Sequence, residues 1–211
     1  MERTRGRQVC EALVSSKMKM EKLWLASKSP RRAEILRAIN WPFEIAAANV
    51  DESVRESEAP HSYVERLARE KATAVANKPR TKTRLVLGAD TIVVVGDEIL
   101  GKPRDEEDAR RMLRLLSQTG WHEVLTGIAL LRCTEDLDAR GCVAHEKTRV
   151  RFAAMSKAEI DWYVASKETM DKAGAYAVQG RAALFIEEIA GDYWNIVGLP
   201  VRLLYELYKS M

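Results

Sequence analysis

Residues 27–32 read Ser-Lys-Ser-Pro-Arg-Arg and lie where a short apolar stretch gives way to a helical pattern. Ser29 suits the N-cap of a helix, and Pro30 suits its first position. Backbone N–H groups at a helix start favour an anion, and the forked donors of Arg31 and Arg32 match phosphate oxygens. The alternative is a plain helix start with both arginines in solvent, although two arginines in a first turn oppose the helix dipole.

Asp90 interrupts an otherwise apolar strand predicted over residues 84–95. Burying an unpaired carboxylate is costly, and a metal ion, a lysine or a reacting water would offset that cost. The alternative is an aspartate at a strand end or bulge that accepts backbone hydrogen bonds. Gly96-Asp97 suits a two-residue hairpin turn. Counting back from that turn places Lys102 opposite Thr91 and beside Asp90, where its ammonium group can serve the same anionic ligand.

Lys71 and Glu52 are two further charged residues that could belong to a site around Asp90. Lys71 lies four residues after Leu67, on the apolar side of a predicted helix, so it either reaches the surface or points into a cleft. Glu52 follows a predicted strand and supplies a second carboxylate. Two carboxylates, several cations and a helix N-terminus are what metal-assisted attack on a phosphate ester needs. Spacing alone does not bring these groups together.

The elements that must position these residues alternate between strands and helices. Apolar patterns predict strands over residues 22–26, 43–50, 84–95, 122–132, 146–153 and 183–189. They predict helices over residues 30–39, 60–77 and 156–166, after Asp105, and after Pro200. The Gly96-Asp97 hairpin requires an antiparallel pair. We therefore expect an α/β domain with a mixed sheet.

Composition narrows the class of protein. The chain has 211 residues, enough for one large domain or two small lobes. Its net charge of +3 is too small for nucleic-acid binding by bulk electrostatics. Three widely spaced cysteines form neither a closed disulfide framework nor a C-x-x-C pair, which favours a reduced, cytoplasmic protein. No apolar run reaches membrane-spanning length.

The first residues differ from the rest of the chain. Residues 1–20 are basic and polar, without the apolar stretch of a signal peptide. Met18 and Met20 lie just before the first predicted strand, so each is a candidate for the natural first residue of the protein. We expect an N-terminal extension over residues 1–20, either not native or disordered, and a single catalytic domain over residues 21–211.

Seven segments resemble a known family. They are LASKSPRRAEIL, NVDES, LAREKA, LGADTIVV, GKPRD, DKAGAYAVQG and GDYWNIVGLP, in this order. Together, over about residues 22–209, they resemble the Maf family of nucleoside triphosphate pyrophosphatases, house-cleaning enzymes also linked to septum formation. The resemblance implies an elongated α/β fold, similar to inosine triphosphate pyrophosphatases, with a cleft between two lobes. It also implies hydrolysis of a nucleoside triphosphate to the monophosphate and pyrophosphate, a divalent cation (Mg or Mn), and a homodimer.

The resemblance assigns roles by position. Asp90 matches the presumed general base, and Glu52 and Asp90 are the expected metal ligands. The expected substrate-binding residues are Ser27, Arg31, Arg32, Lys71, Thr91, Lys102 and Gln179. Lys28 departs from the family pattern, in which many relatives have a small residue between the two serines. Three of these positions, namely Arg31, Thr91 and Gln179, match those associated with substrate choice.

The branch of the family follows from the C-terminal motifs. Gln179-Gly180 followed by GDYWNIVGLP looks like the branch acting on dTTP and UTP, with modified pyrimidine nucleotides as further candidates. The alternative branch prefers 7-methyl-GTP. The alternative from another class is a non-catalytic nucleotide- or RNA-binding module linked to cell division. That module would need Arg31, Arg32 and Lys71 but neither Asp90 nor Glu52. The chain lacks the aromatic stacking motifs typical of such a module, so we expect no stable nucleic-acid partner.

Overall fold

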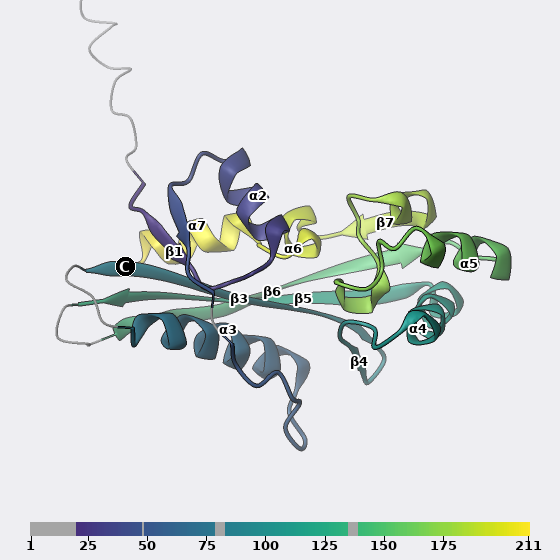
Figure 1. The fold of residues 1–211 in the computed structure, drawn as a ribbon, viewed down its shortest axis with the longest axis horizontal. Helices are drawn as coiled ribbons and strands as arrows, with labels where there is room; N and C mark the ends of the chain where they lie inside the picture. The colour runs from purple at the N-terminus through teal and green to yellow at the C-terminus, as the bar shows by residue number, and fades with distance from the viewer. Residues whose placement is uncertain (1–19, 48, 79–82, 135–138) are drawn as a thin grey trace, which may run out of the picture.

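The computed structural model describes residues 20–211 except 48, 79–82 and 135–138, so the predictions for residues 1–19 lie outside the described residues. One mixed sheet runs the length of the molecule (Figure 1). Its strands are β1 (Leu23–Leu25), β2 (Phe43–Ile45), β3 (Arg84–Val95), β4 (Glu98–Leu100), β5 (Trp121–Cys133), β6 (Ala139–Phe152) and β7 (Ile186–Ala190). The helices are α2 (Pro30–Ala38), α3 (Pro60–Ala76), α4 (Glu106–Thr119), α5 (Lys157–Ala165), α6 (Tyr193–Val197) and α7 (Val201–Lys209).

The order of strands leaves part of β3 open at one edge. The sheet runs β2-β1-β3-β5-β6-β7, with β4 paired to β3. β1 lies parallel to β3 and pairs with residues 85–87, and β4 lies antiparallel to β3 and pairs with residues 93–95. Among the described strands, none pairs with residues 88–92 on this edge. The opening lies at Asp90 and Thr91.

Helix α3 lies unusually close to the face of the sheet to which Asp90 points. A Cβ atom at Gly88 would lie 2.0 Å from the backbone oxygen of Ala68, and one at Gly127 would lie 2.3 Å from that of Val64. Only glycine leaves room for the helix at these two points. Gly127 is also the register partner of Asp90 in β5. The two glycines therefore bring α3, which carries Lys71, down onto the strand that carries Asp90.

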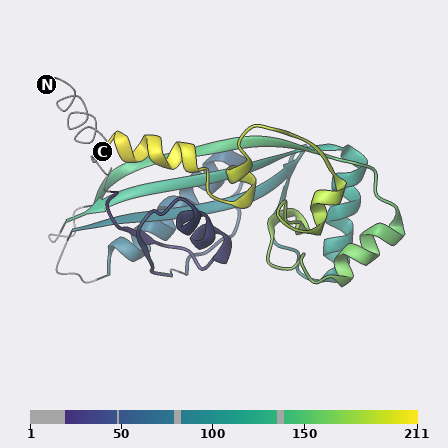
Figure 2. The ribbon, with the colours of Figure 1, turned by 90° about the horizontal axis from the view of Figure 1, so that it is seen from above.

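The long strands β3, β5 and β6 join two packed ends. At one end α2 and α7 cover one face of the sheet and α3 covers the other (Figure 1). At the other end α4 and α5 pack with β4 and with residues near Tyr176 around a separate core (Figure 2). The predicted mixed α/β fold with two lobes is confirmed. In the part of the chain that the structure describes, no helix is both long and apolar enough to span a bilayer.

Several boundaries differ from the prediction. The strand predicted over residues 43–50 ends at Ile45, because the chain then turns toward the opening, where Asn49 and Glu52 lie. β6 begins at Ala139, earlier than the predicted residue 146. The strand predicted over residues 183–189 is a 3₁₀ helix (Arg181–Phe185) that buries Phe185, followed by β7. Helix α6 was not predicted.

The turn before α2 also differs in detail. Ser29 precedes the helix and Pro30 is its first residue, as predicted, but the Ser29 side chain makes no capping hydrogen bond. Instead its backbone N–H donates to Oγ of Ser27 at 3.2 Å. By contrast, the caps predicted at Asp105 and at Ser156 are both confirmed, the second as a complete capping box. The Ser27 hydroxyl, rather than that of Ser29, therefore fixes the start of the helix.

Candidate active site

A cavity of about 540 Å³ lies at the open edge of β3, between the two lobes. All of the site residues predicted from the sequence line it, namely Ser27, Arg31, Arg32, Glu52, Lys71, Asp90, Thr91, Lys102 and Gln179. Adjacent residues of a strand point to opposite faces of the sheet. Asp90 and Thr91 therefore divide the cavity wall into two faces, which we call the Asp90 face and the Thr91 face.

The Asp90 face holds a lysine between two carboxylates. The Lys71 ammonium nitrogen lies 2.6 Å from Oδ1 of Asp90 and 2.6 Å from Oε1 of Glu52. The side chains of Lys71 and Asp90 are only 11% and 12% exposed. Charge-assisted contacts of this length are strong where water is largely excluded. Lys71 thus points into the cleft, and Asp90 is not a strand-end aspartate satisfied by the backbone.

Glu52 reaches this face from an irregular segment that is fixed by a tyrosine. The hydroxyl of Tyr63, in α3, donates to the backbone oxygen of Glu52 at 2.7 Å. Partial burial would raise the pKa of Glu52, but the hydrogen bond and charge of Lys71, with Lys102 and Arg32 nearby, lower that pKa overall. Burial, followed by the negative charges of Asp90 and Glu52, raises the pKa of Tyr63 to about 12. Glu52 is therefore held as a carboxylate.

The Thr91 face holds a buried guanidinium group. Arg32 donates from Nε to the backbone oxygen of Gly198 at 2.7 Å, from Nη1 to Oγ of Ser27 at 3.0 Å, and from Nη2 to Oγ1 of Thr91 at 3.0 Å. Gly198 has a φ of +117°, which favours glycine. Burial lowers the pKa of Arg32 overall, although the charge of Asp90 acts in the opposite direction. The interpretation of this arginine as a solvated helix residue is wrong.

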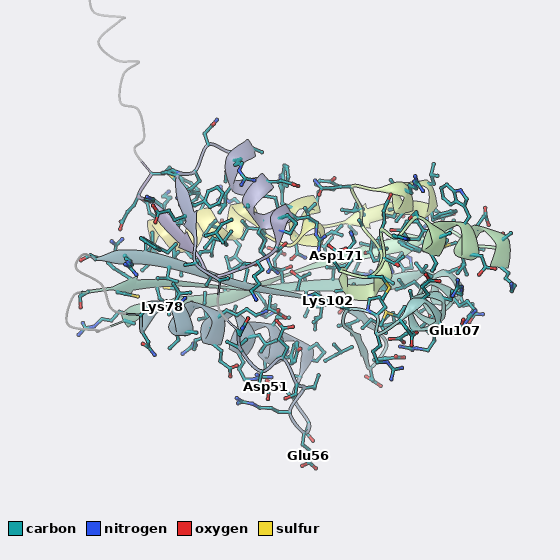
Figure 3. The ribbon with its side chains drawn as sticks, viewed as in Figure 1. Asp51, Glu56, Lys78, Lys102, Glu107 and Asp171 are labelled. Carbon is teal, nitrogen blue, oxygen red and sulfur yellow. The ribbon has the colours of Figure 1, made fainter. Side chains whose placement is uncertain are left out.

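Arg31 and Lys102 lie toward the rim. Arg31 donates from Nη1 to Oδ2 of Asp171 at 2.8 Å and from Nη2 to its backbone oxygen at 3.2 Å. This pair joins α2 to the segment before Tyr176, across the opening. The predicted hairpin and its register are confirmed, but the pairing ends at Leu100, so Lys102 lies beyond the ladder and does not pair with Thr91. It is exposed and lines the cavity, near the middle of the molecule with Asp171 (Figure 3).

Several residues of the cavity wall had no predicted role. Asp171, Tyr63 and Tyr176 line it. The hydroxyl of Tyr176 lies 2.8 Å from Nε2 of His122, a buried side chain of β5. Asp171 and Tyr176 belong to the DKAGAYAVQG motif, which was a signal for their importance, whereas Tyr63 could be read only as a core residue of its helix.

The arrangement defines an α/β protein with a cation-rich cavity around a buried carboxylate. Lys71, Arg32, Arg31 and Lys102 suit a ligand with several negative charges, and Asp90 suits proton transfer. Among the described residues no three His, Cys, Asp or Glu side chains gather to hold a metal ion. Glu52 and Asp90, which both contact Lys71, are two carboxylates that the described part of the chain brings together in the cavity.

Comparison with known proteins gives the family. The model of the Maf family, described as "Maf-like protein", matches residues 22–211, and the chain therefore belongs to the Maf family. It is 53% identical to a protein of Symbiobacterium thermophilum named "dTTP/UTP pyrophosphatase", over 87% of this chain and 90% of that protein. It is also 53% identical to a protein of the same name from Hahella chejuensis, over 90% of this chain and 92% of that protein.

A solved structure gives a weaker likeness. "The structure of the Staphylococcus aureus Ham1 protein" aligns at a TM-score of 0.45 and 15% identity, over 90% of this chain and 99% of that one. Because that score is low, the fold class rests on the sheet itself and on the family match.

Proposed function

We propose that this Maf protein hydrolyses dTTP and UTP to the nucleoside monophosphate and pyrophosphate. The observation that carries the proposal is the convergence of Asp90, Glu52 and Lys71 in a cavity whose other walls present Arg31, Arg32 and Lys102. The names of relatives that are 53% identical supply the substrates. A cation-rich cavity suits a triphosphate, and a buried carboxylate within it suits activation of water.

In the proposed mechanism the triphosphate lies along Lys71, Lys102 and residues 27–32. Asp90 accepts a proton from a water molecule as the water oxygen attacks the α-phosphorus. The bond between that phosphorus and the oxygen bridging to the β-phosphorus breaks, and pyrophosphate leaves. Lys71 orients Asp90 before the reaction and stands beside the charge that develops in the transition state.

A divalent cation fits the same residues. Glu52 and Asp90 already share one positive centre, the Lys71 ammonium nitrogen, and Mg²⁺ in nucleotide sites is bound by one or two carboxylates together with substrate phosphates. When bound, the cation would neutralise phosphate charge. We propose Mg or Mn in this role, held by Glu52 and Asp90. We expect EDTA to abolish turnover and either metal ion to restore it.

Gln179 is the proposed contact to the base. Its side chain lines the exposed rim of the cavity, and an amide offers both a donor and an acceptor to a pyrimidine edge. The homodimer and the cytoplasmic location implied by the resemblance and by the cysteines stay predictions. Sedimentation of the purified chain tests the first of them.

The test of the function is a screen of triphosphates for released pyrophosphate and orthophosphate, with Mg²⁺ and with Mn²⁺. We expect pyrophosphate from dTTP and UTP, with purine triphosphates and 7-methyl-GTP turned over more slowly. Orthophosphate as the first product would overturn the proposed bond cleavage. Binding of nucleotides without any turnover would favour a non-catalytic module.

A further inference from the structure

A chain of hydroxyl groups runs from the cavity wall into the core beneath the Thr91 face. Oγ1 of Thr91 lies 2.9 Å from Oγ1 of Thr126, in the neighbouring strand β5. Oγ1 of Thr126 lies 3.0 Å from the backbone oxygen of Asn195, in α6. Thr126 and Asn195 are fully buried, whereas Thr91 is partly exposed to the cavity. The chain begins at the Arg32 guanidinium group, which lies 3.0 Å from Thr91.

The direction of every hydrogen bond in this chain is fixed. A carbonyl oxygen only accepts, so Thr126 must donate its single hydroxyl hydrogen to Asn195. Thr126 can then only accept from Thr91, so Thr91 donates its hydrogen inward. A guanidinium group only donates, so Thr91 accepts from Arg32. The Thr91 hydroxyl has one lone pair left and no hydrogen to offer to a ligand.

From this polarity we infer that Thr126 is a positioning residue that presents Thr91 to the cavity as an acceptor only. Phosphate oxygens are themselves acceptors, so Thr91 cannot bind them in this arrangement. A ligand gains a hydrogen bond there only by presenting a donor. The inference rests on the proposed function and deepens it, because thymine and uracil carry such a donor at N3–H, whereas cytosine has an acceptor at N3 and its donor at the 4-amino group, so an acceptor placed opposite N3 separates the two kinds of base.

The geometry of the strand supports a contact with the nucleoside end. Thr91 and Asp90 point to opposite faces of β3, so Thr91 points away from Lys71 and the two carboxylates. The Arg32 guanidinium group separates Thr91 from Ser27 of the phosphate-binding turn. On the Thr91 face the backbone of Gly198 comes so close that a Cβ there would lie 3.4 Å from Oγ1 of Thr91. The apolar side chains of Val178 and Val197 line the same cavity. An acceptor hydroxyl beside apolar side chains suits the N3–H group of a planar base.

The test replaces Thr126 with valine, which keeps its shape and removes its hydroxyl. The Thr91 hydroxyl then loses its inward acceptor and can turn its hydrogen toward cytosine N3. We expect the ratio of kcat/KM for dTTP to that for dCTP to fall by about tenfold, mainly through a gain with dCTP. Thr126→Ser keeps the hydroxyl and should restore the wild-type ratio. Thr126→Ala carries the same expectation should the valine variant not fold.

Thr148→Val is the matched control, because Thr148 is an equally buried strand threonine whose hydroxyl bonds to Asp192 and Asn195 and does not line the cavity. We expect it to lower the melting temperature without changing the ratio. An unchanged ratio in Thr126→Val, with a stability loss like that of Thr148→Val, would show a structural role only and overturn the inference.

Two substrates separate the possible donors, since the sugar 3′-hydroxyl is the other donor that dTTP and UTP share. A dTTP analogue methylated at N3 should lose the Thr126-dependent effect, and 2′,3′-dideoxy-TTP should keep it; the reverse result would overturn the assignment to the base. Wild-type protein that releases no pyrophosphate from dTTP would instead reject the proposed function, which keeps the two failures distinct.

Discussion

The two faces of β3 at the open edge hold their cations in opposite ways. Lys71, on the Asp90 face, is bound by two carboxylates at 2.6 Å each, whereas Arg32, on the Thr91 face, donates to three neutral oxygens. Among the described residues Arg32 forms no ion pair. A phosphate must compete with directly bound carboxylates for Lys71, whereas the direct acceptors of Arg32 are neutral and the charges of Asp90 and Glu52 act on it without a hydrogen bond. A cation paired with a carboxylate suits proton transfer, and a guanidinium group fixed by neutral acceptors suits orientation of the ligand.

Of these substitutions, replacement of Asp90 should lower turnover most. Asp90→Asn keeps the shape of the side chain but removes its capacity to take a proton, so we expect kcat to fall by about 10²–10⁴-fold with nucleotide binding retained. Pyrophosphate release and nucleotide titration measure the two effects. Asp97→Asn, in the exposed hairpin turn, is the control. Turnover close to wild type in Asp90→Asn would remove the chemical role of this face.

The buried His122, whose Nε2 contacts the hydroxyl of Tyr176, provides a second test through the pH dependence of folding stability. Burial, partly offset by a backbone hydrogen bond at Gly120, lowers the pKa of His122 to about 4, against about 6.5 in an unfolded chain. The unfolded state therefore binds more protons between these values, so stability is fully present above about pH 6.5 and falls as pH drops toward 4. The expected decrease in the free energy of unfolding over this range is about 3 kcal/mol.

Urea unfolding between pH 4 and 7 measures this slope. His122→Gln keeps a partner for the Tyr176 hydroxyl but does not titrate, and it should flatten the slope. His145→Gln, at a half-exposed histidine, is the control. An equally steep slope in His122→Gln would assign the acid sensitivity to other groups.

Arg32→Lys tests the Thr91 face. A lysine keeps the charge but cannot bond Gly198, Ser27 and Thr91 at once. We expect kcat/KM to fall by about 10–100-fold, corresponding to about 1.4–2.8 kcal/mol, chiefly through KM. Arg37→Lys, at an exposed position of the same helix, should have little effect. A pure loss of kcat would place Arg32 with the chemistry rather than with orientation.

Asp171→Asn should give the smallest effect and the opposite sign. Although partial burial raises the pKa of Asp171, hydrogen bonds from Lys172 and Arg31 lower that pKa overall, so Asp171 holds Arg31 as a carboxylate. Its side chain is 59% exposed, and such pairs contribute little stability. Releasing Arg31 should lower KM by about two- to fivefold, with the melting temperature almost unchanged. A raised KM would show that the pair itself builds the binding site.

The sequence predicted the elements that carry strong local signals. The strand over residues 84–95, the hairpin turn at Gly96-Asp97 and the capped helix after Ser156 all agree with the structure. Asp90 stood out because a carboxylate in an apolar strand needs a partner, and Lys71 stood out on the apolar side of its helix. Both signals are local and physical.

Other features depend on contacts that are distant in sequence. The bonds of Arg32 to Gly198 and of Thr126 to Asn195 join residues far apart in the chain, so no local pattern reveals them. Gly127 reads as an ordinary strand glycine until α3 is placed on it. The 3₁₀ helix that ends at Phe185 has a strand-like apolar pattern, and its packing in the second lobe decides its conformation.

Attack of water on the α-phosphorus is tested most directly by hydrolysis of dTTP in water enriched in ¹⁸O. Attack on the α-phosphorus, with Asp90 accepting the proton, places one labelled oxygen in the thymidine monophosphate and none in the pyrophosphate. Mass spectrometry of the two products measures this. The proposed mechanism predicts label in the monophosphate alone; label in pyrophosphate or orthophosphate would place the attack on another phosphorus and contradict it.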